Sequence, residues 1–173
     1  MAREQATLVD ERIRNGWLRA TDAELLRDCR EERYKSSGPG GQHRNKVETA
    51  VRVHHTPSGV SGQGEETRSQ EENRRHALSR LRERIAFTVR APFDLEAPDV
   101  PPEFTRQRRG SSIAANAKNP KFPLIVATAL DALLAADGGY AIAARALGLT
   151  TSQLRKFLQS DRELWRAVSE RFA

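Results

Sequence analysis

Proline divides this chain more sharply than any other residue. Six of the eight prolines in its 173 residues lie within residues 91–123. Each proline fixes φ and lacks a backbone donor, so a cluster of them interrupts helices and strands. The charge changes there too, from four acidic and no basic side chains over 91–103 to five basic and no acidic ones over 104–121. We therefore predict a first domain over 1–90, a proline-rich linker over 91–121 and a helical module over 122–173.

The first domain carries signals for both helices and strands. Capping boxes at residues 21–24 and 69–72 each predict the start of a helix, and the second helix has an apolar face at helical spacing. That face consists of Ala77, Leu78, Leu81 and Ile85. A small sheet is predicted from an extended stretch at 32–35, a strand at 51–55, a turn at 56–59 and a returning strand from Val60.

The module after the linker contains helix signals alone. Four apolar stripes at helical spacing predict four helices, with breaks at 137–139, Gly148 and 150–151. The stripes are Val126, Ala129, Leu130, Leu133 and Leu134; Ile142, Ala143, Ala146 and Leu147; Leu154, Phe157 and Leu158; and Leu164, Trp165, Val168 and Phe172. The predicted fold class is therefore α+β, a short sheet with helices followed by an all-helical module. Trp17, Trp165 and Cys29 are expected to be buried.

Composition and charge restrict the function further. The net charge of +6 and the pI of about 10.1 favour a polyanionic partner, RNA or DNA. The apolar stretch 122–136 is short and contains Asp131, and the N-terminus has no apolar run, so neither a membrane span nor a secretory signal is predicted. Cys29 is the single cysteine, and the adjacent His54 and His55 point to opposite faces of a strand, so no metal site is predicted. We expect a cytoplasmic monomer without a cofactor.

Residues 36–42 (Ser-Ser-Gly-Pro-Gly-Gly-Gln) cannot lie within a helix or strand, because three glycines and a proline occupy four positions. The loop is not a P-loop, since Gln42 follows Gly41 where a lysine is needed, and it lacks the spaced glycines of a dinucleotide site. A Ser/His/Asp triad built on the loop serines and His43 has no orienting acid marked in the sequence. The common catalytic uses of such a loop are therefore not supported.

What remains is a neutral amide, Gln42, which Gly40 and Gly41 present beside basic and polar side chains. Those side chains are His43, Arg44, Asn45 and Lys46. An amide is a poor general base near neutral pH, but it can position a water, and its backbone N–H can stabilise developing negative charge. Such chemistry needs a site supplied largely by another molecule, and the basic surroundings point to RNA.

At these residues the sequence resembles the class I peptide chain release factors. The matching segments follow one another in the family's order at 36–46, 49–52, 56–59 and 68–70. The resemblance implies that the loop enters the peptidyl transferase centre of the large ribosomal subunit and triggers hydrolysis of the ester between peptide and tRNA. It further implies that Gly40 and Gly41 shape the loop, and that the backbone N–H of Gln42 meets the departing ribose oxygen. The side chain of Gln42 would limit the pocket to water and be the target of a glutamine methyltransferase.

Two departures from the family pattern bear on function. Arg44 stands where the family usually has an apolar residue. Release factors that read stop codons carry a substantial domain before the loop, with Pro-x-Thr or Ser-Pro-Phe at its tip. Only 41 residues precede Gln42, and neither tripeptide occurs in the chain. We therefore expect hydrolysis of peptidyl-tRNA without standard stop-codon reading, as in the short relatives that rescue stalled ribosomes and hold the mRNA channel with a basic tail.

Basic residues outside the loop extend the predicted RNA contacts. They are Arg52, Arg68, Arg106, Arg108, Arg109, Arg155 and Lys156. The stretch that contains Arg106, Arg108, Arg109, Lys118 and Lys121 is internal to the chain. It is either a solvated linker or a contact to rRNA or mRNA, and the sequence leaves both open.

Residues 143–158 resemble the helix-turn-helix of Fis-type DNA-binding proteins. Small alanines let two helices cross closely, Gly148 makes the turn, and Arg155 and Lys156 lie on the second helix within reach of phosphates. An ordinary helical bundle with exposed charges is the alternative. The rival function for the whole chain is therefore a nucleic-acid- or ribosome-binding helix-turn-helix protein that lacks hydrolytic activity.

Overall fold

The computed structural model describes residues 8–35 and 48–172, and the chain forms two compact units. The first consists of residues 20–85 and is called the sheet unit. The second, the helical unit, combines the chain before residue 20 with the chain from residue 86 onward. The sheet unit is therefore inserted, in sequence, into the helical unit.

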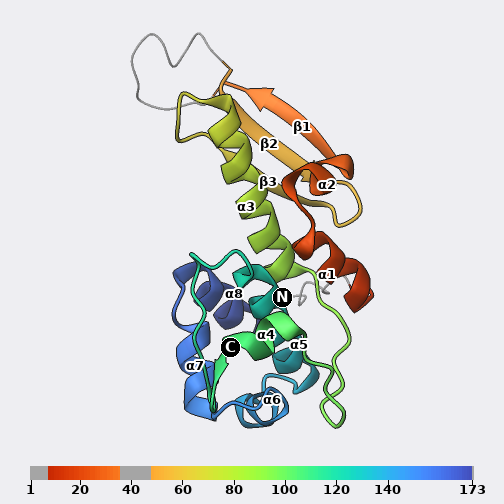
Figure 1. Cartoon of the computed structure of the whole chain (residues 1–173), viewed down its shortest axis with the longest axis vertical. Coiled ribbons are helices and arrows are strands. Elements are labelled where there is room, and N and C mark those ends of the chain that lie inside the picture. Colours follow the sequence, from red (N-terminus) through yellow and green to blue (C-terminus); the bar gives the residue numbers. More distant parts are fainter. Residues whose placement is uncertain (1–7, 36–47, 173) are drawn as a thin grey trace. The chain divides into compact units, whose positions relative to one another are not determined.

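The sheet unit is a three-stranded antiparallel sheet with a long helix on one face (Figure 1). Its strands lie in the order β1-β2-β3, which makes β2 central. Side chains alternate between the two faces of a strand, so Val51 and Val53 face the helix and are fully buried, whereas Arg52 and His54 lie on the open face. In chain order the elements are α2 (Asp22–Arg27), β1 (Cys29–Tyr34), β2 (Ala50–His55), β3 (Val60–Gly64) and α3 (Gln70–Thr88), of which residues 70–85 belong to this unit.

Two glycines in β3 allow the helix to approach the sheet closely. A Cβ at Gly62 would collide with the carbonyl oxygen of Ala77, and one at Gly64 would collide with that of Asn73. Both carbonyls belong to α3, so the backbones of strand and helix are in direct contact there. Glycine in a strand commonly marks such an approach.

Both predicted helix starts are confirmed, whereas β1 covers Cys29–Tyr34 rather than 32–35, and the Ser69 N–H donates to the Thr67 hydroxyl instead of completing a second capping box. The Thr21 hydroxyl accepts from the backbone N–H of Glu24, and the Glu24 carboxylate accepts from that of Thr21, which completes the capping box of α2. The hydroxyl of Ser69 accepts from the backbone N–H of Glu72 at the start of α3. The four apolar residues predicted to face the core from α3 are all fully buried. Strand β2 extends the predicted strand by one residue, Ala50.

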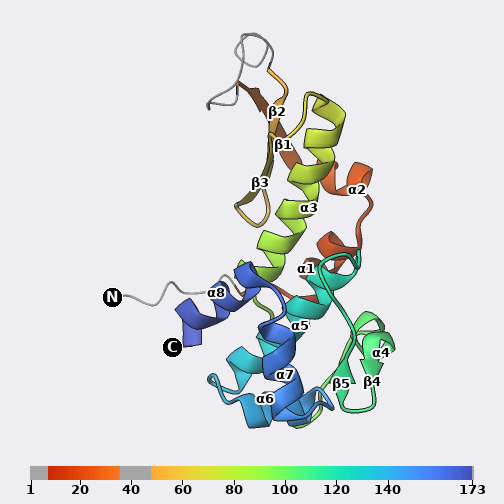
Figure 2. The ribbon, with the colours of Figure 1, turned by 90° about the vertical axis from the view of Figure 1, so that its left-hand side faces the viewer.

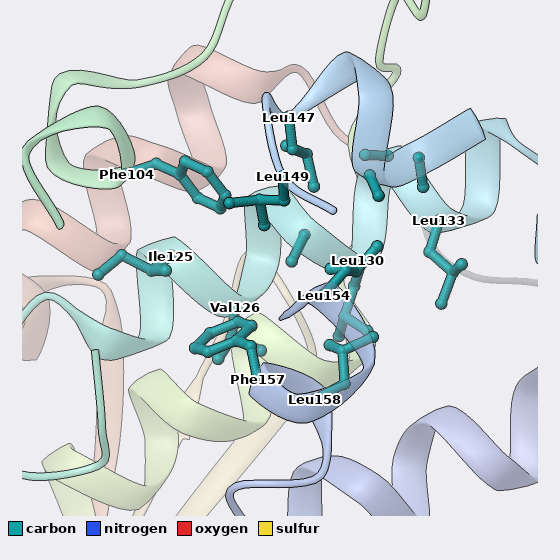
Figure 3. Packing of buried hydrophobic residues seen from close by; sticks show 14 of the residues in the cluster. Phe104, Ile125, Val126, Leu130, Leu133, Leu147, Leu149, Leu154, Phe157 and Leu158 are labelled. Carbon is teal, nitrogen blue, oxygen red and sulfur yellow. The ribbon is translucent and has the colours of Figure 1, made fainter. Parts of the chain in front are cut away.

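Helix α5 lies at the centre of the helical unit and is buried over almost its whole length (Figure 2). Its core combines residues from α4 to α8, as Figure 3 shows for Phe104, Leu130 and Phe157. The four helices predicted after residue 122 are confirmed. In chain order the elements are α1 (Glu11–Arg19), α4 (Pro102–Gln107), β4 (Arg108–Arg109), β5 (Ser112–Ile113), α5 (Phe122–Ala135), α6 (Tyr140–Ala146), α7 (Thr151–Leu158) and α8 (Arg162–Phe172).

The turn between α6 and α7 ends the first helix where the sequence predicts. Gly148 has a φ of 68°, in the left-handed region that glycine enters without steric cost. The N–H of Leu149 donates to Ala144 O at 2.8 Å, and the N–H of Gly148 donates to Arg145 O at 3.1 Å. These two bonds form a Schellman motif, which satisfies the last carbonyls of α6.

A buried carboxylate between two buried arginines links three parts of the helical unit. Asp131 in α5 pairs with Arg14 of α1 and with Arg90, whose Nη1 lies 2.9 Å from Asp131 Oδ1. The Asp131 carboxylate also accepts from the backbone N–H of Ala91 at 3.1 Å. Burial lowers the pKa of Arg90 to about 10. The three ionised groups hold more positive than negative charge, which makes Asp131 the counterion on which both arginines depend.

The compact units differ from the predicted division of the chain. Helix α1 belongs to the helical unit, and the stretch predicted as a linker over 91–121 contributes α4, the β4–β5 hairpin and the fully buried Phe104. The difference arises because prolines also begin helices. Pro102 and Pro123 stand in the first turns of α4 and α5, where a missing N–H costs nothing.

The α+β fold class is confirmed. No helix within the described residues is long and apolar enough to cross a membrane. Trp17 and Trp165 are partly buried, and Trp165 packs against the helical core. Cys29 is also partly buried; its thiol donates to Leu25 O at 3.1 Å, and burial raises its pKa to about 11.

Candidate functional site

The Gly-Gly-Gln segment falls between the two described parts of the sheet unit. The predicted site residues Gly40, Gly41, Gln42, His43, Arg44, Asn45 and Lys46 lie outside the described residues. The strands before and after this segment, β1 and β2, pair with each other. Tyr34, the last residue of β1, is the partner of Ala50, the first residue of β2. Both flanks therefore leave the sheet at the same end.

Asn73 fixes the return flank to α3. It is fully buried, and its amide Nδ2 donates to Thr49 O at 2.8 Å and to Thr67 O at 2.9 Å. Its Oδ1 accepts from the backbone N–H of Thr67 at 3.0 Å and from the Thr67 hydroxyl at 3.3 Å. One side chain thus joins the residue before β2, the segment after β3 and the first turns of α3. Sequence reasoning missed this role, because a lone asparagine within a helix gives no signal for it.

The predicted RNA-binding residues of the sheet unit lie in different settings. Arg52 lies on the open face of the sheet with its guanidinium 5.1 Å from the centre of the Tyr34 ring. With the Gln63 amide oxygen turned toward it, Arg52 donates from Nε and Nη2 at 2.9 and 3.0 Å. Arg68 is exposed in the segment between β3 and α3. Arg52 is therefore oriented by its neighbours, whereas Arg68 is presented to solvent.

The two adjacent histidines lie on opposite faces, as predicted. His54 is on the open face, where Nδ1 lies 2.6 Å from the Ser61 hydroxyl and Nε2 lies 3.3 Å from Glu32 Oε2. His55 is buried, and its Nδ1 lies 2.7 Å from the Ser58 hydroxyl. Burial lowers the pKa of His55. Over 8–35 and 48–172, no group of three or more His, Cys, Asp or Glu side chains is placed to hold a metal ion.

Ion pairs connect α3 to β1 and to the segment after β3. Arg74 Nε lies 2.6 Å from Glu31 Oε2. The hydrogen bond from Arg74 lowers the pKa of Glu31, although partial burial opposes the shift. Burial would raise the pKa of Glu66, but hydrogen bonds from Arg80, backbone N–H groups and His76 hold it at about 2. These pairs position the helix on the sheet through residues that show no pattern in the sequence.

The other predicted RNA-binding residues lie in the helical unit. Arg106 lies in the last turn of α4, Arg108 and Arg109 form β4, and Arg155 and Lys156 lie on α7. All five are exposed. The structure thus divides the predicted site residues between the two units, with the Gly-Gly-Gln flanks in one and these five basic side chains in the other.

A match to a family model identifies the class of protein to which this chain belongs. The chain belongs to the RF-1 domain family. The family model matches residues 24–116, more than half of the chain, and the match runs from within α2 to just beyond the β4–β5 hairpin. It is longer at both ends than the similarity apparent from the motifs alone.

Curated relatives share the name Peptide chain release factor 1. The protein of Lacticaseibacillus casei (strain BL23) is 49% identical over 59 residues, which is 34% of this chain and 16% of the relative. That of Dictyoglomus thermophilum is 48% identical over 59 residues, with the same coverage. That of Chloroherpeton thalassium is 48% identical over 73 residues, 42% of this chain and 20% of the relative. The chain thus spans a fifth or less of the length of these relatives.

Proposed function

We propose that this protein promotes hydrolysis of peptidyl-tRNA on the ribosome through Gly40-Gly41-Gln42, without standard stop-codon reading. The observation that carries the proposal is the RF-1 domain match over residues 24–116, because it includes the Gly-Gly-Gln segment, the strands on both sides of it and all of α3. The shared name of the relatives supports a role in peptide release. The proposal includes that this release serves the rescue of stalled ribosomes in the cytoplasm; neither Pro-x-Thr nor Ser-Pro-Phe occurs within the 173 residues.

In the proposed chemistry the main role belongs to a backbone N–H group, and the side chains have a smaller part. Water attacks the carbonyl carbon of the ester, and the ribose oxygen of the tRNA leaves with developing negative charge. The backbone N–H of Gln42 donates to that oxygen, while the amide side chain restricts the pocket to a small nucleophile. Ribosomal RNA supplies the remainder of the site, and His43, Arg44, Asn45 and Lys46 contact it. Methylation of Gln42 at N5 is part of the proposal.

The described flanks of the Gly-Gly-Gln segment support a site that is shared between this segment and ribosomal RNA. A short catalytic segment must be held at a fixed position by a rigid base. Here the base consists of the Tyr34–Ala50 strand pair and the Asn73 side chain bound to Thr49 O. Both are built from the sheet and α3, so the unit can present a segment without contributing a self-contained active site.

A peptide-release assay tests the proposal. Purified ribosomes that hold peptidyl-tRNA are mixed with the protein, with a stop codon, a sense codon or no mRNA in the decoding site. We expect release with the empty site. Gln42→Pro removes the backbone donor and should lower the rate about 10²–10³-fold, whereas Gln42→Ala keeps the donor and serves as the matched control with a milder loss.

Release at the background rate under all three conditions would reject the proposal. The rival function, a nucleic-acid- or ribosome-binding protein without hydrolytic activity, would then account for the retained fold. Equal rates for Gln42→Pro and wild type would reject the backbone mechanism while leaving release itself in place.

A further inference from the structure

Exposed charge on the helical unit is almost entirely positive between Phe104 and Ser160. This stretch holds eight basic and two acidic residues. All eight basic residues are exposed, whereas one acid, Asp131, is buried between Arg14 and Arg90. Among the described residues, none of the eight has an ion-pair partner. The eight are Arg106, Arg108, Arg109, Lys118, Lys121, Arg145, Arg155 and Lys156.

The β4–β5 hairpin is attached to the turn between α6 and α7. The backbone N–H of Thr150 donates to Ser111 O at 3.1 Å, and Arg108 Nη1 donates to Leu147 O at 3.5 Å. A Cβ at Gly148 would collide with the Arg108 guanidinium, so the glycine makes room for the arginine. Strand β5 also lies against α7. Two basic segments that are some 45 residues apart in the sequence therefore lie on contacting elements.

Helix α7 turns its polar residues away from the core. Leu154, Phe157 and Leu158 are buried, so helical geometry places Ser152, Lys156 and Gln159 on the opposite, exposed face. At the edge of this face the Arg155 guanidinium lies 4.9 Å from the centre of the Tyr140 ring. The cation is held over the ring while the side chain stays exposed.

We propose that Arg106, Arg108, Arg109, Arg155 and Lys156 form one surface, the hairpin–helix surface, which binds the sugar-phosphate backbone of double-stranded RNA. Unpaired exposed cations on two contacting elements match the charge of a polyphosphate. Three of the four aromatic residues between 104 and 160 are buried, and the fourth, Tyr140, lies beneath Arg155. The surface therefore lacks the open aromatic faces on which unpaired bases stack, and the backbone of a duplex is the better fit.

Neutral hydrogen-bonding groups on the same helix suit RNA. Thr151 and Ser152 on α7 and Gln159 directly after it are exposed, and they carry hydroxyl and amide groups that can meet the 2′-hydroxyls of an A-form minor groove. The choice of RNA over DNA also rests on the proposed function, in which the partner is the ribosome. A helix of ribosomal RNA would then hold the protein by its helical unit while the sheet unit carries the Gly-Gly-Gln segment.

Fluorescence anisotropy with the full chain tests the surface without ribosomes. The probe is a labelled RNA duplex of about 20 base pairs, and the same sequence as a DNA duplex and as single-stranded RNA provides the comparison. The test variant R106Q/K156Q removes one charge from the last turn of α4, directly before the hairpin, and one from α7, and it spares Arg108, which also bonds the turn. The matched control R12Q/R166Q removes two exposed charges from α1 and α8.

For the RNA duplex we expect R106Q/K156Q to bind about tenfold or more weakly near 0.1 M salt, with a log–log salt slope smaller by about two. The control variant should bind within about twofold of wild type. Equal losses in both variants, or no loss in either, would overturn the proposal, as would tighter binding of DNA or of single-stranded RNA. Because no peptidyl-tRNA is present, failure here is distinct from failure of the release assay.

Discussion

The two units of this protein differ in how many of their charged side chains are paired. In the sheet unit, five arginines pair with carboxylates of the same unit, and two of these pairs join α3 to β1 or to the segment after β3. The pairs are Arg30–Glu32, Arg33–Glu31, Arg74–Glu31, Arg74–Glu71, Arg80–Glu66 and Arg82–Asp22. In the helical unit one carboxylate is buried between two arginines, and the exposed bases between 104 and 160 are unpaired within the described chain.

The contrast teaches which charges hold a fold and which are available to a partner. An exposed ion pair contributes about 0.2–1 kcal/mol and mainly orients its elements. A buried carboxylate that compensates two cations is far more sensitive, because its removal leaves charge without a counterion. Exposed cations without a partner add little to stability and are available for binding. The two units can be tested separately, since both tryptophans, Trp17 and Trp165, belong to the helical unit.

The largest effect is expected at the buried carboxylate. Asp131→Asn keeps the size of the side chain but leaves Arg14 and Arg90 without a counterion, which should cost the helical unit about 3–5 kcal/mol. Tryptophan fluorescence during urea unfolding measures the loss. The exposed Asp137→Asn in the turn after α5 serves as the control. Midpoints that coincide for the two variants would contradict the role given to Asp131.

A triple variant separates charge from packing at the same place. R14M/R90M/D131L removes all three charges together and replaces them with apolar side chains of comparable length. It should recover most of the stability that Asp131→Asn loses, because no buried charge remains unpaired. If the triple variant is no more stable than Asp131→Asn, the shape of the side chains, rather than their charge, dominates the stability at this place.

A smaller effect is expected at the buried amide of the sheet unit. Asn73→Ala leaves Thr49 O and the backbone groups of Thr67 without their partner, which should cost about 2–3 kcal/mol. Amide hydrogen exchange of residues 50–64 measures the loss, and tryptophan fluorescence should stay unchanged. Gln70→Ala, which removes a single bond of 3.5 Å to Glu48 O, is the matched control. Equal exchange in the two variants would argue against Asn73 as the anchor of the flank.

The smallest effect on stability is expected when the pH is lowered. The folded-state pKa of Glu31 is lowered by Arg74, and that of Glu66 lies at about 2, against an ordinary value of 4.5. A lowered folded pKa means that these carboxylates stabilise the sheet unit above pH 4.5 and lose that contribution as the pH falls toward 2. Urea midpoints of sheet-unit amide resonances at pH 6 and pH 3 measure it.

Glu31→Gln in β1 should reduce this pH dependence, whereas Glu72→Gln, at an exposed carboxylate of α3, should leave it intact. The loss should be about 1 kcal/mol or less, because the pairs are partly exposed. A pH dependence that Glu31→Gln does not alter would assign the acid sensitivity to other groups.

Sequence reasoning located the elements better than it located their partners. Capping residues at Thr21 and Ser69, and the apolar stripes after residue 122, identify helices because their signals are local. The family resemblance identified the Gly-Gly-Gln segment for the same reason. The pairing of Arg14 with Asp131 spans 117 positions and has no local signal. The prolines were misleading because a residue that interrupts one helix also begins the next, as Pro102 and Pro123 do.

The insertion of one unit within the other has a consequence for how the protein is made. Synthesis runs from the N-terminus, so a nascent chain carries Arg14 long before Asp131 has been added. Residues 20–85 are contiguous and are complete once α3 has left the ribosome, whereas α1 must wait for α5. Domains generally fold as units during translation. The inserted unit can therefore mature first, while its host stays unfinished until the second half of the chain emerges.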